Sequence, residues 1–129
     1  MYNQSINNLD VLVLEINPNN DIALAGKGLI LASYQNDYGQ ALPYLNKALE
    51  VNPNNQAALR IKAAIFQTQG NYDQALPYLD KLLDINPNDE LTLFAKSVIL
   101  FSLGRYDESL LLDNKILQID PNSHAASNP

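Results

Sequence analysis

The amino-acid sequence predicts an all-α fold, a solenoid in which antiparallel helix pairs stack in a row. The first observation is a five-residue motif, here called the repeated phrase, that occurs four times, as INPNN at 16–20, VNPNN at 51–55, INPND at 85–89 and IDPNS at 119–123. Its prolines are 35, 34 and 34 residues apart. The second observation is that two runs of apolar residues at helical spacing lie between successive phrases. A fixed period of this size is typical of repeats that bury their apolar faces by stacking on their neighbours.

Each full repeat is predicted to hold two helices. We divide the chain into the second helix of an incomplete repeat at 1–20, three full repeats at 21–55, 56–89 and 90–123, and a truncated start of a further repeat or a tail at 124–129. In the middle repeat the apolar face of the first helix is Leu59, Ala63 and Phe66. The apolar face of its second helix is Ala75, Leu79, Leu82 and Leu83.

Turn residues separate the two helices of a repeat. Gly70 and Gly104 stand where the first helix needs a left-handed residue after its C-terminus, and Asn71 is predicted to cap the second helix. The first full repeat has one extra residue at 34–37 and no turn glycine, which predicts a longer loop there.

Prolines are predicted to limit the helices. Pro53, Pro87 and Pro121 of the repeated phrase end the second helices, because proline cannot continue a helix and pushes the preceding residue out of the helical region. Pro43 and Pro77 stand near the start of second helices, where we expect a late helix start or a slight bend.

Residue sizes within the period resemble the tetratricopeptide repeat, whose unit is 34 residues long. The residues that carry the resemblance are the large residues Leu24, Leu59 and Leu93, the small residues Gly28, Ala63 and Ser97, the apolar residues Leu31, Phe66 and Leu100, the tyrosines Tyr38, Tyr72 and Tyr106, the small residues Ala41, Ala75 and Ser109, and the apolar residues Ala48, Leu82 and Ile116. The resemblance covers residues 21–123 and implies a right-handed superhelical solenoid. Asp113 departs from the family, which has a large apolar residue there, and we expect that side of the last helix to face water.

Composition excludes several classes of protein. The 129 residues carry 14 acidic and 8 basic side chains, a net charge of −6, and the basic residues are scattered, which argues against a nucleic-acid partner. With no cysteine there is no thiolate metal site or disulfide framework. We see no membrane-spanning run of 18 apolar residues and no signal peptide, and take a cytoplasmic location as the default.

Catalytic chemistry has few candidate residues. The single histidine, His124, has no second histidine or cysteine with which to share a metal. Acidic neighbours such as Asp107 and Glu108 recur at helix starts, where the helix dipole favours negative charge. Lys27, Lys62 and Lys96 recur at one repeat position, where we favour a structural role, with the stem covering apolar surface, over an anion-binding track. We therefore predict a protein that is not an enzyme and has no cofactor, metal or catalytic residue.

A concave groove is the binding surface that the resemblance implies, lined by the first helices. The residues expected to contact a partner there are Ile22, Leu29, Arg60, Ile61, Leu91, Phe94, Val98 and Phe101, with Phe94 and Phe101 as anchors. The carboxylate clamp of chaperone-binding members needs lysine, asparagine and arginine where this chain has Ala25, Leu29, Ile61, Leu91 and Ala95. A mostly apolar groove is typical of a site for a helix or an apolar peptide.

The predicted function is a protein-protein interaction scaffold that binds an apolar or amphipathic segment of a partner in this groove. One alternative is a self-assembling module, a homo-oligomer formed through its open ends or grooves. Another is a segment that positions a substrate within a larger enzyme. The sequence leaves both alternatives open.

Overall fold

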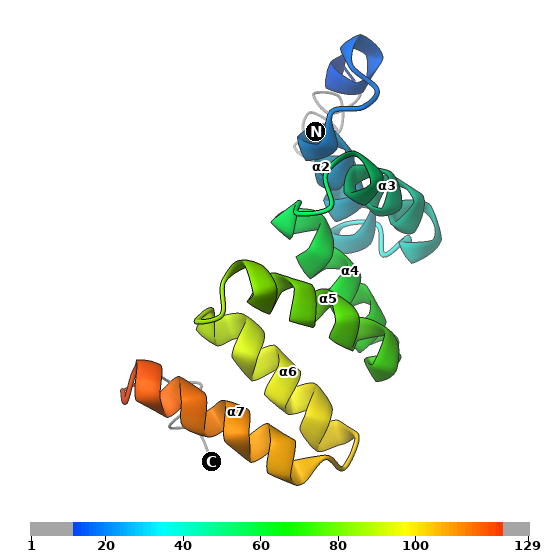
Figure 1. The fold of residues 1–129 in the computed structure, drawn as a ribbon. Coiled ribbons are helices and arrows are strands. Elements are labelled where there is room, and N and C mark those ends of the chain that lie inside the picture. Colours follow the sequence, from blue (N-terminus) through cyan, green and yellow to red (C-terminus); the bar gives the residue numbers. More distant parts are fainter. Residues whose placement is uncertain (1–11, 123–129) are drawn as a thin grey trace. The chain divides into compact units, whose positions relative to one another are not determined.

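The structure is a computed structural model that describes residues 12–122. In this range the chain forms helices and no strand. Residues 12–16 are helical, and the longer helices that follow are α2 (Asp21–Ser33), α3 (Tyr38–Val51), α4 (Gln56–Thr68), α5 (Tyr72–Ile85), α6 (Glu90–Ser102) and α7 (Tyr106–Ile119). They come in consecutive pairs, each joined by a short turn (Figure 1). The all-α fold of helix pairs is confirmed. The repeat boundaries stay a prediction from the period.

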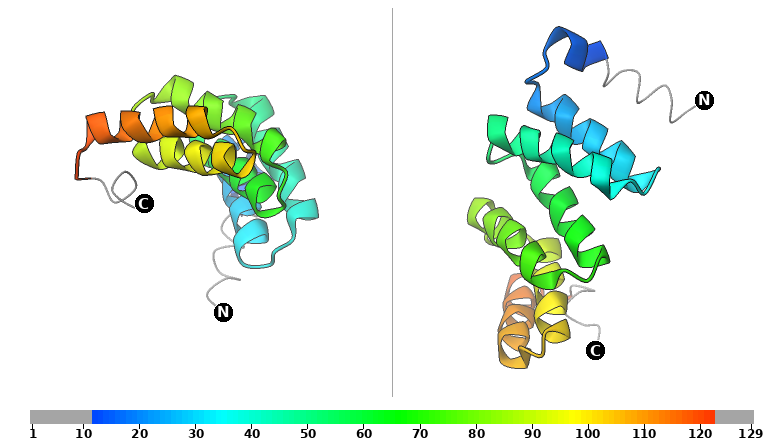
Figure 2. Two further views of the ribbon diagram at one scale, coloured as in Figure 1. Left: turned by 90° about the horizontal axis from the view of Figure 1, so that it is seen from below. Right: turned by 90° about the vertical axis from the view of Figure 1, so that its right-hand side faces the viewer.

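The chain divides into two compact units, Met1–Ile65 and Phe66–Pro129, and the division falls within α4. In the first unit α2 and α3 pack side by side, as the right-hand view of Figure 2 shows. The core of this unit is made by buried aliphatic side chains of α2, α3 and α4, among them Leu24, Leu31, Leu45, Ala48 and Ile65. In the second unit α6 packs against both α5 and α7. Its buried aliphatic residues include Leu79, Leu82, Leu93, Ile99, Leu100 and Ile116.

The repeated phrase forms the same turn at each of its four occurrences. Its first polar side chain accepts a hydrogen bond from the backbone N–H two residues later, at 3.0–3.2 Å from Asn17, Asn52, Asn86 and Asp120. The residue just before α2 and α4 then caps the helix, because Asn20 accepts from the N–H of Ala23 and Asn55 from that of Ala58. Before α6 the equivalent residue, Asp89, makes no such cap bond and accepts instead from the hydroxyl of Thr92 at 2.9 Å. The repeated phrase therefore forms the same turn at each occurrence and also caps the following helix at two of them.

The first helices end as the glycines predict. Gly70 and Gly104 have φ of 76° and 78°, and the next residue donates back to a carbonyl five residues earlier, Asn71 to Phe66 and Arg105 to Leu100, each at 2.8 Å. After α2, the predicted longer loop is confirmed as residues 34–37. There Asn36 has φ of 52°, and Asp37 donates to Leu31, six residues back, at 2.9 Å. The extra residue is thus absorbed without losing the closing hydrogen bond.

Two local predictions were wrong. Asn71 stands at the start of α5, but its side-chain oxygen makes no cap bond, and its amide donates instead to Gln69. The late helix start expected at Pro43 and Pro77 is wrong, because their helices begin at Tyr38 and Tyr72 and continue through the prolines. The alternative expectation, a slight bend, stays a prediction. Each proline is the sixth residue of its helix, so it removes one backbone donor close to the N-terminus.

Two further sequence predictions concern residues outside the described range. Most of the leading half repeat and the tail with His124 lie there. Among the helices of residues 12–122, none is long and apolar enough to cross a membrane.

Candidate protein-binding surface

The side chains predicted to line the groove lie on three first helices. On α2, Ile22 is 77% exposed and Leu29 is 46% exposed. On α4, Arg60 is exposed, whereas Ile61 is half-buried and packs against the core of the first unit. The remaining four lie on α6, in the second unit. Each unit thus presents part of the predicted set, and the set on α6 is the largest.

On α6 the four predicted residues form one stripe. Leu91, Phe94, Val98 and Phe101 are spaced by three, four and three residues, which places them on one face of the helix. Leu91 is 74% exposed, Phe101 63% and Val98 37%, while Phe94 is half-buried. The other face of the same helix buries Leu93, Ile99 and Leu100. We call these four residues the α6 stripe; its outer members can lose more exposed area to a partner than Phe94 can.

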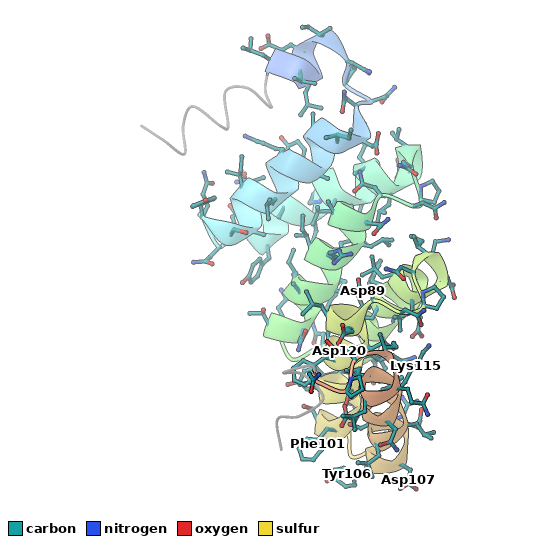
Figure 3. The ribbon with its side chains drawn as sticks, turned by 90° about the vertical axis from the view of Figure 1, so that its left-hand side faces the viewer. Asp89, Phe101, Tyr106, Asp107, Lys115 and Asp120 are labelled. Atoms are coloured by element: carbon teal, nitrogen blue, oxygen red, sulfur yellow. The ribbon has the colours of Figure 1, made fainter. Side chains whose placement is uncertain are left out.

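Tyr106 extends the α6 stripe around the corner into α7. Its ring lies edge-on to that of Phe101, with the ring centres 5.3 Å apart and the planes at 61°. Figure 3 shows the two rings together at the end where α6 turns into α7, with Asp107 beside them. Sequence reasoning treated Tyr106 only as a structural signature, yet it is 57% exposed.

Between α6 and α7 lies a buried polar cluster. The hydroxyls of Ser97 and Ser109 are 2.8 Å apart, and Ser109 also donates to the carbonyl of Ser97 at 2.9 Å. Ser97 in turn donates to Asp113 at 2.6 Å. The prediction that this side of α7 faces water is therefore wrong, because Asp113 is half-buried and hydrogen-bonded to the neighbouring helix.

The repeated lysines link successive helix pairs. Lys62 of α4 donates to the amide oxygen of Asn46 on α3, and Lys96 of α6 forms an ion pair with Asp80 of α5 at 2.6 Å. Asn46 and Asp80 stand at equivalent positions of their helices. Lys62 as a whole is buried, with 8% of its surface exposed. These contacts support the structural role over an anion-binding track.

Two acidic side chains, one half-buried and one exposed, have lowered pKa values. The side-chain amides of Asn55 and Asn52 donate to Asp21 at 2.9 and 3.1 Å, and these hydrogen bonds lower the pKa of Asp21 below its ordinary 3.8. Arg105 holds Glu108 with two hydrogen bonds, of 2.7 and 2.8 Å, which lower the pKa of Glu108 and raise that of Arg105. Both arrangements join loop and helix-start residues, as expected of structural caps.

Charge is divided unequally between the two units. Residues 12–65 carry four acidic and four basic side chains, whereas residues 66–122 carry nine acidic and four basic ones. The second unit, which holds the α6 stripe, is therefore the acidic one. Such a surface attracts a partner segment with basic side chains.

A cleft of about 480 Å³ opens in the first unit. Its lining is mainly apolar and also includes three charged residues. The apolar and aromatic residues are Leu14, Pro18, Leu24, Pro43 and Tyr44, and the charged residues are Glu15, Lys27 and Lys47. Sequence reasoning did not find it, because the lining comes from three separate segments. Its size lies within the range of small-ligand or side-chain pockets.

Within residues 12–122 no three His, Cys, Asp or Glu side chains come close enough to hold a metal ion. The polar groups that do converge, at Asp21 and at Ser97, are engaged with one another in structural hydrogen bonds.

Comparison with known proteins gives consistent results. Two family models, each described as tetratricopeptide repeat, match residues 29–90 and 66–127. No curated protein matches the chain. Among solved structures, the chain is similar to a tetratricopeptide repeat protein from Parabacteroides merdae, with 23% identity, a TM-score of 0.86, and coverage of 96% of this chain and 49% of that one.

Two further solved structures are described as peptide-binding. YrrB, a tetratricopeptide repeat protein with an unusual peptide-binding site, is 20% identical with a TM-score of 0.78, over 97% of this chain and 64% of its own. The first such domain of Spaghetti (RPAP3), bound to the HSP90 peptide SRMEEVD, is 18% identical with a TM-score of 0.72, over 84% of this chain and 85% of its own. The chain thus spans about half to two thirds of the Parabacteroides merdae protein and YrrB. At these identities the likeness establishes the fold.

Proposed function

The chain belongs to the tetratricopeptide repeat family, and from this premise we propose that it is a non-enzymatic interaction scaffold that captures an apolar or amphipathic segment of a partner protein. The family's repeats are generally interaction modules, which supports the general role. The choice of partner segment and of surface is our proposal. It rests on the side chains that the first helices expose.

The α6 stripe is the observation that carries the proposal. Leu91 and Phe101 are large apolar side chains with most of their surface exposed, and they stand ten residues apart on one helix face. Fully burying such a side chain contributes about 1.5–3 kcal/mol. Two anchors and the flanking Val98 therefore supply a gross stabilisation of several kcal/mol, from which the entropy cost of association is subtracted.

The chemistry of the partner follows from the same surface. Apolar anchors at both ends of a helix face fit a helix or extended segment with apolar side chains at matching intervals. The acidic character of residues 66–122 favours basic residues between or beside those anchors. We propose a basic, amphipathic segment, held at the α6 stripe and extended by Tyr106.

Selection from a peptide library displayed on phage tests the proposal. The immobilised protein should enrich peptides with spaced large apolar residues and a net positive charge. Synthetic versions of those peptides should bind the wild-type chain, and the double variant Leu91→Glu/Phe101→Glu should bind at least tenfold more weakly, a loss of about 1.4 kcal/mol or more.

A matched control is Leu111→Glu, which places the same charge at a 68% exposed leucine of α7 outside the stripe. This variant should bind like the wild type. Equal binding by the Leu91→Glu/Phe101→Glu variant, or enrichment of acidic peptides alone, would overturn the proposal. Circular dichroism of each variant excludes unfolding as the cause of a loss.

Self-assembly is the alternative that the exposed apolar side chains also favour. A mass of 14.3 kDa by light scattering across a concentration series would leave the α6 stripe free for a partner. If the wild-type chain is a dimer and the Leu91→Glu/Phe101→Glu variant is a monomer, the stripe is instead an interface between two copies. The remaining alternative, positioning a substrate within a larger enzyme, is supported by no described residue.

A further inference from the structure

The outward face of α6 carries no charged side chain. It consists of the α6 stripe together with Ala95 and Ser102. The two charged residues of the helix, Glu90 and Lys96, are half-buried, and Lys96 is paired with Asp80 of α5. The outward face of a surface helix is ordinarily charged or polar. A face without charge, on a unit that is rich in charge, is therefore typical of a contact surface.

Exposure at these positions is a property of the first helix of a pair. Ile22 and Leu29 of α2 stand at the same repeat positions as Leu91 and Val98 of α6. Ile22 and Leu29 are 77% and 46% exposed, against 74% and 37% for Leu91 and Val98. In the chain α2 is followed by two further helix pairs. The exposure of the α6 stripe therefore does not depend on α6 belonging to the last pair.

The spacing within the α6 stripe is that of a coiled-coil seam. Intervals of three, four and three residues are those of apolar positions in a heptad repeat. In such a seam each apolar side chain of the facing helix packs among four residues at i, i+3, i+4 and i+7. On α6 these four are Leu91, Phe94, Ala95 and Val98, which we call the α6 quartet. Ala95 has the smallest side chain of the quartet, as the point of closest approach requires.

Backbone hydrogen bonds decide which conformation of a bound segment suits this face. An extended segment turns backbone N–H and C=O groups toward the surface, and these need partners once water is displaced. The outward face of α6 has one polar side chain, Ser102, whose hydroxyl donates to the carbonyl of Val98 at 3.0 Å. A helix satisfies its backbone groups internally. It can therefore lie along an apolar face without losing hydrogen bonds.

We propose that the α6 stripe binds its partner segment as a single α-helix, packed along α6 in the manner of a coiled coil. This inference rests on the proposed function, which leaves the conformation of the segment open. The partner helix presents apolar side chains at intervals of three, four and three residues, one of which packs among the α6 quartet. Its outer face is basic, because residues 66–122 carry nine acidic and four basic side chains.

A second copy of the chain fits this face less well than a different protein does. The α6 stripe of a second copy has the matching spacing, but pairing the two would bring together two units with a large excess of acidic side chains. Like charges at an interface oppose association. A basic helix of another protein has both the spacing and the opposite charge.

The test compares two synthetic peptides of about 14 residues, a length that covers the roughly 15 Å from Leu91 to Phe101 as a helix. Both have capped ends and the same content of leucine, lysine and alanine. In the helical peptide the leucines are spaced by three, four and three residues, and in the alternating peptide they stand at every second residue, as in a strand. Each is added to the full chain labelled with ¹⁵N. We expect the helical peptide to shift the amides of Leu91, Val98 and Phe101, with a Kd below about 1 mM, and the alternating peptide to bind at least about tenfold more weakly.

A third peptide tests the bound conformation without changing the contact surface. It is the helical peptide with proline in place of a central lysine of its outer face. Proline inside a helix removes a hydrogen bond and clashes with the preceding turn, whereas an extended segment accepts it. The proline peptide should bind at least about tenfold more weakly than its parent. Because a free helix of this length is marginal in water, circular dichroism of the mixture should also show more helix than the sum of its parts.

Matched variants of the protein test the α6 quartet. Ala95→Leu enlarges the apolar face but occupies the space of the partner's side chain, so it should weaken the helical peptide several-fold. Leu91→Glu/Phe101→Glu should weaken it at least about tenfold, and Leu111→Glu should bind it normally. Thermal melts followed by circular dichroism confirm that each variant is folded.

The outcomes separate this inference from the proposed function. Equal or tighter binding of the alternating or proline peptide overturns the helical conformation and leaves capture at the α6 stripe intact. The same holds if the helical peptide causes no shifts at about 1 mM while library-selected peptides bind and are weakened by Leu91→Glu/Phe101→Glu. If the library-selected peptides fail as well, the proposed function fails with the inference. A wild-type dimer that Leu91→Glu/Phe101→Glu converts to a monomer would make a second copy the occupant and overturn the inference.

Discussion

The absence of a Cβ atom at Gly28 allows α2 and α3 to pack closely. A Cβ at this position would lie 2.6 Å from Cδ2 and 2.7 Å from Cγ of Leu45, which is fully buried. The small residue expected from the repeat pattern is therefore required by direct contact. Gly39, in the first turn of α3, is different, because its nearest neighbour would be Asp37 Oδ1 at 3.7 Å.

The same substitution should thus have opposite effects at the two glycines. Gly28→Ala should lower the free energy of unfolding by about 1–3 kcal/mol, because Leu45 must move within a packed core. Gly39→Ala should leave it unchanged or raise it by up to about 1 kcal/mol, because alanine restricts the unfolded chain. Urea unfolding followed by circular dichroism measures both. A Gly28→Ala variant as stable as Gly39→Ala would contradict the close contact.

Asp21 should make the first unit sensitive to acid. Its folded-state pKa is lowered by Asn55 and Asn52, so the stabilisation is present above the ordinary pKa of 3.8 and is lost as the pH falls through the lowered value. The Asp21→Asn variant has no carboxyl group to titrate at this position. Its melting temperature should therefore fall less than that of the wild type between about pH 5 and pH 2.5. Asn52→Ala, which removes one donor, should show an intermediate slope. Parallel pH profiles for all three proteins would refute the assignment.

At the scale of helices, the α6–α7 pair differs from the pairs before it. Where α6–α7 has Ser97, Ser109 and Asp113, the middle repeat has Ala63, Ala75 and Leu79. The polar set is internally hydrogen-bonded, so its members depend on one another. Sequence reasoning considered Asp113 alone and therefore expected it in water. Considering the three positions together would have predicted the cluster.

Asp113→Ala should destabilise the protein by about 1–3 kcal/mol, because it removes the acceptor of a buried hydroxyl. The triple variant Ser97→Ala/Ser109→Ala/Asp113→Leu restores the residues of the middle repeat and should be at least as stable as the wild type, because replacing all partners of a buried polar network by apolar groups is often neutral or favourable. Thermal melts decide between these outcomes. A triple variant less stable than Asp113→Ala would show that the interface is shaped for the polar set.

Helix limits were predictable where one residue decides them. Gly70, Gly104 and the phrase prolines fix local backbone angles, so their effects can be read from the sequence alone. The late start expected at Pro43 and Pro77 was wrong, because tertiary context can override the loss of one backbone donor near a helix start. The exposure of Tyr106 could not be predicted, since it depends on which helix lies beside it in space.

At the scale of the whole molecule, the proposed partner segment rests on two features, the exposed apolar side chains and the acidic charge of residues 66–122. The apolar character of the exposed face of α6 was predicted from the repeat register, because the register determines which residues of a first helix point away from the core. The exposure of Tyr106, Leu110 and Leu117 on α7 was not predicted, because the equivalent residues of α3 and α5 are half-buried. The unequal charge of the two units became visible only when the compact units were known.

One prediction at this scale uses the peptide SRMEEVD, which is bound by the domain of Spaghetti (RPAP3). Here the corresponding first helices carry apolar side chains such as Leu29 and Leu91, and Ala25 is 3% exposed. The glutamates, the aspartate and the terminal carboxylate of this peptide need cationic side chains, whereas these exposed positions carry apolar ones. We expect a Kd weaker than about 1 mM by isothermal titration calorimetry. Micromolar binding would contradict this prediction, because it would require a cluster of basic side chains that the apolar α6 stripe does not provide.

The most direct test of the central claim is the affinity of one library-selected peptide for two double variants, measured side by side by titration calorimetry. The account predicts that Leu91→Glu/Phe101→Glu weakens binding at least tenfold, while Leu110→Glu/Leu117→Glu binds like the wild type. If the first variant binds normally, partner capture at the α6 stripe is wrong, whatever the second variant does.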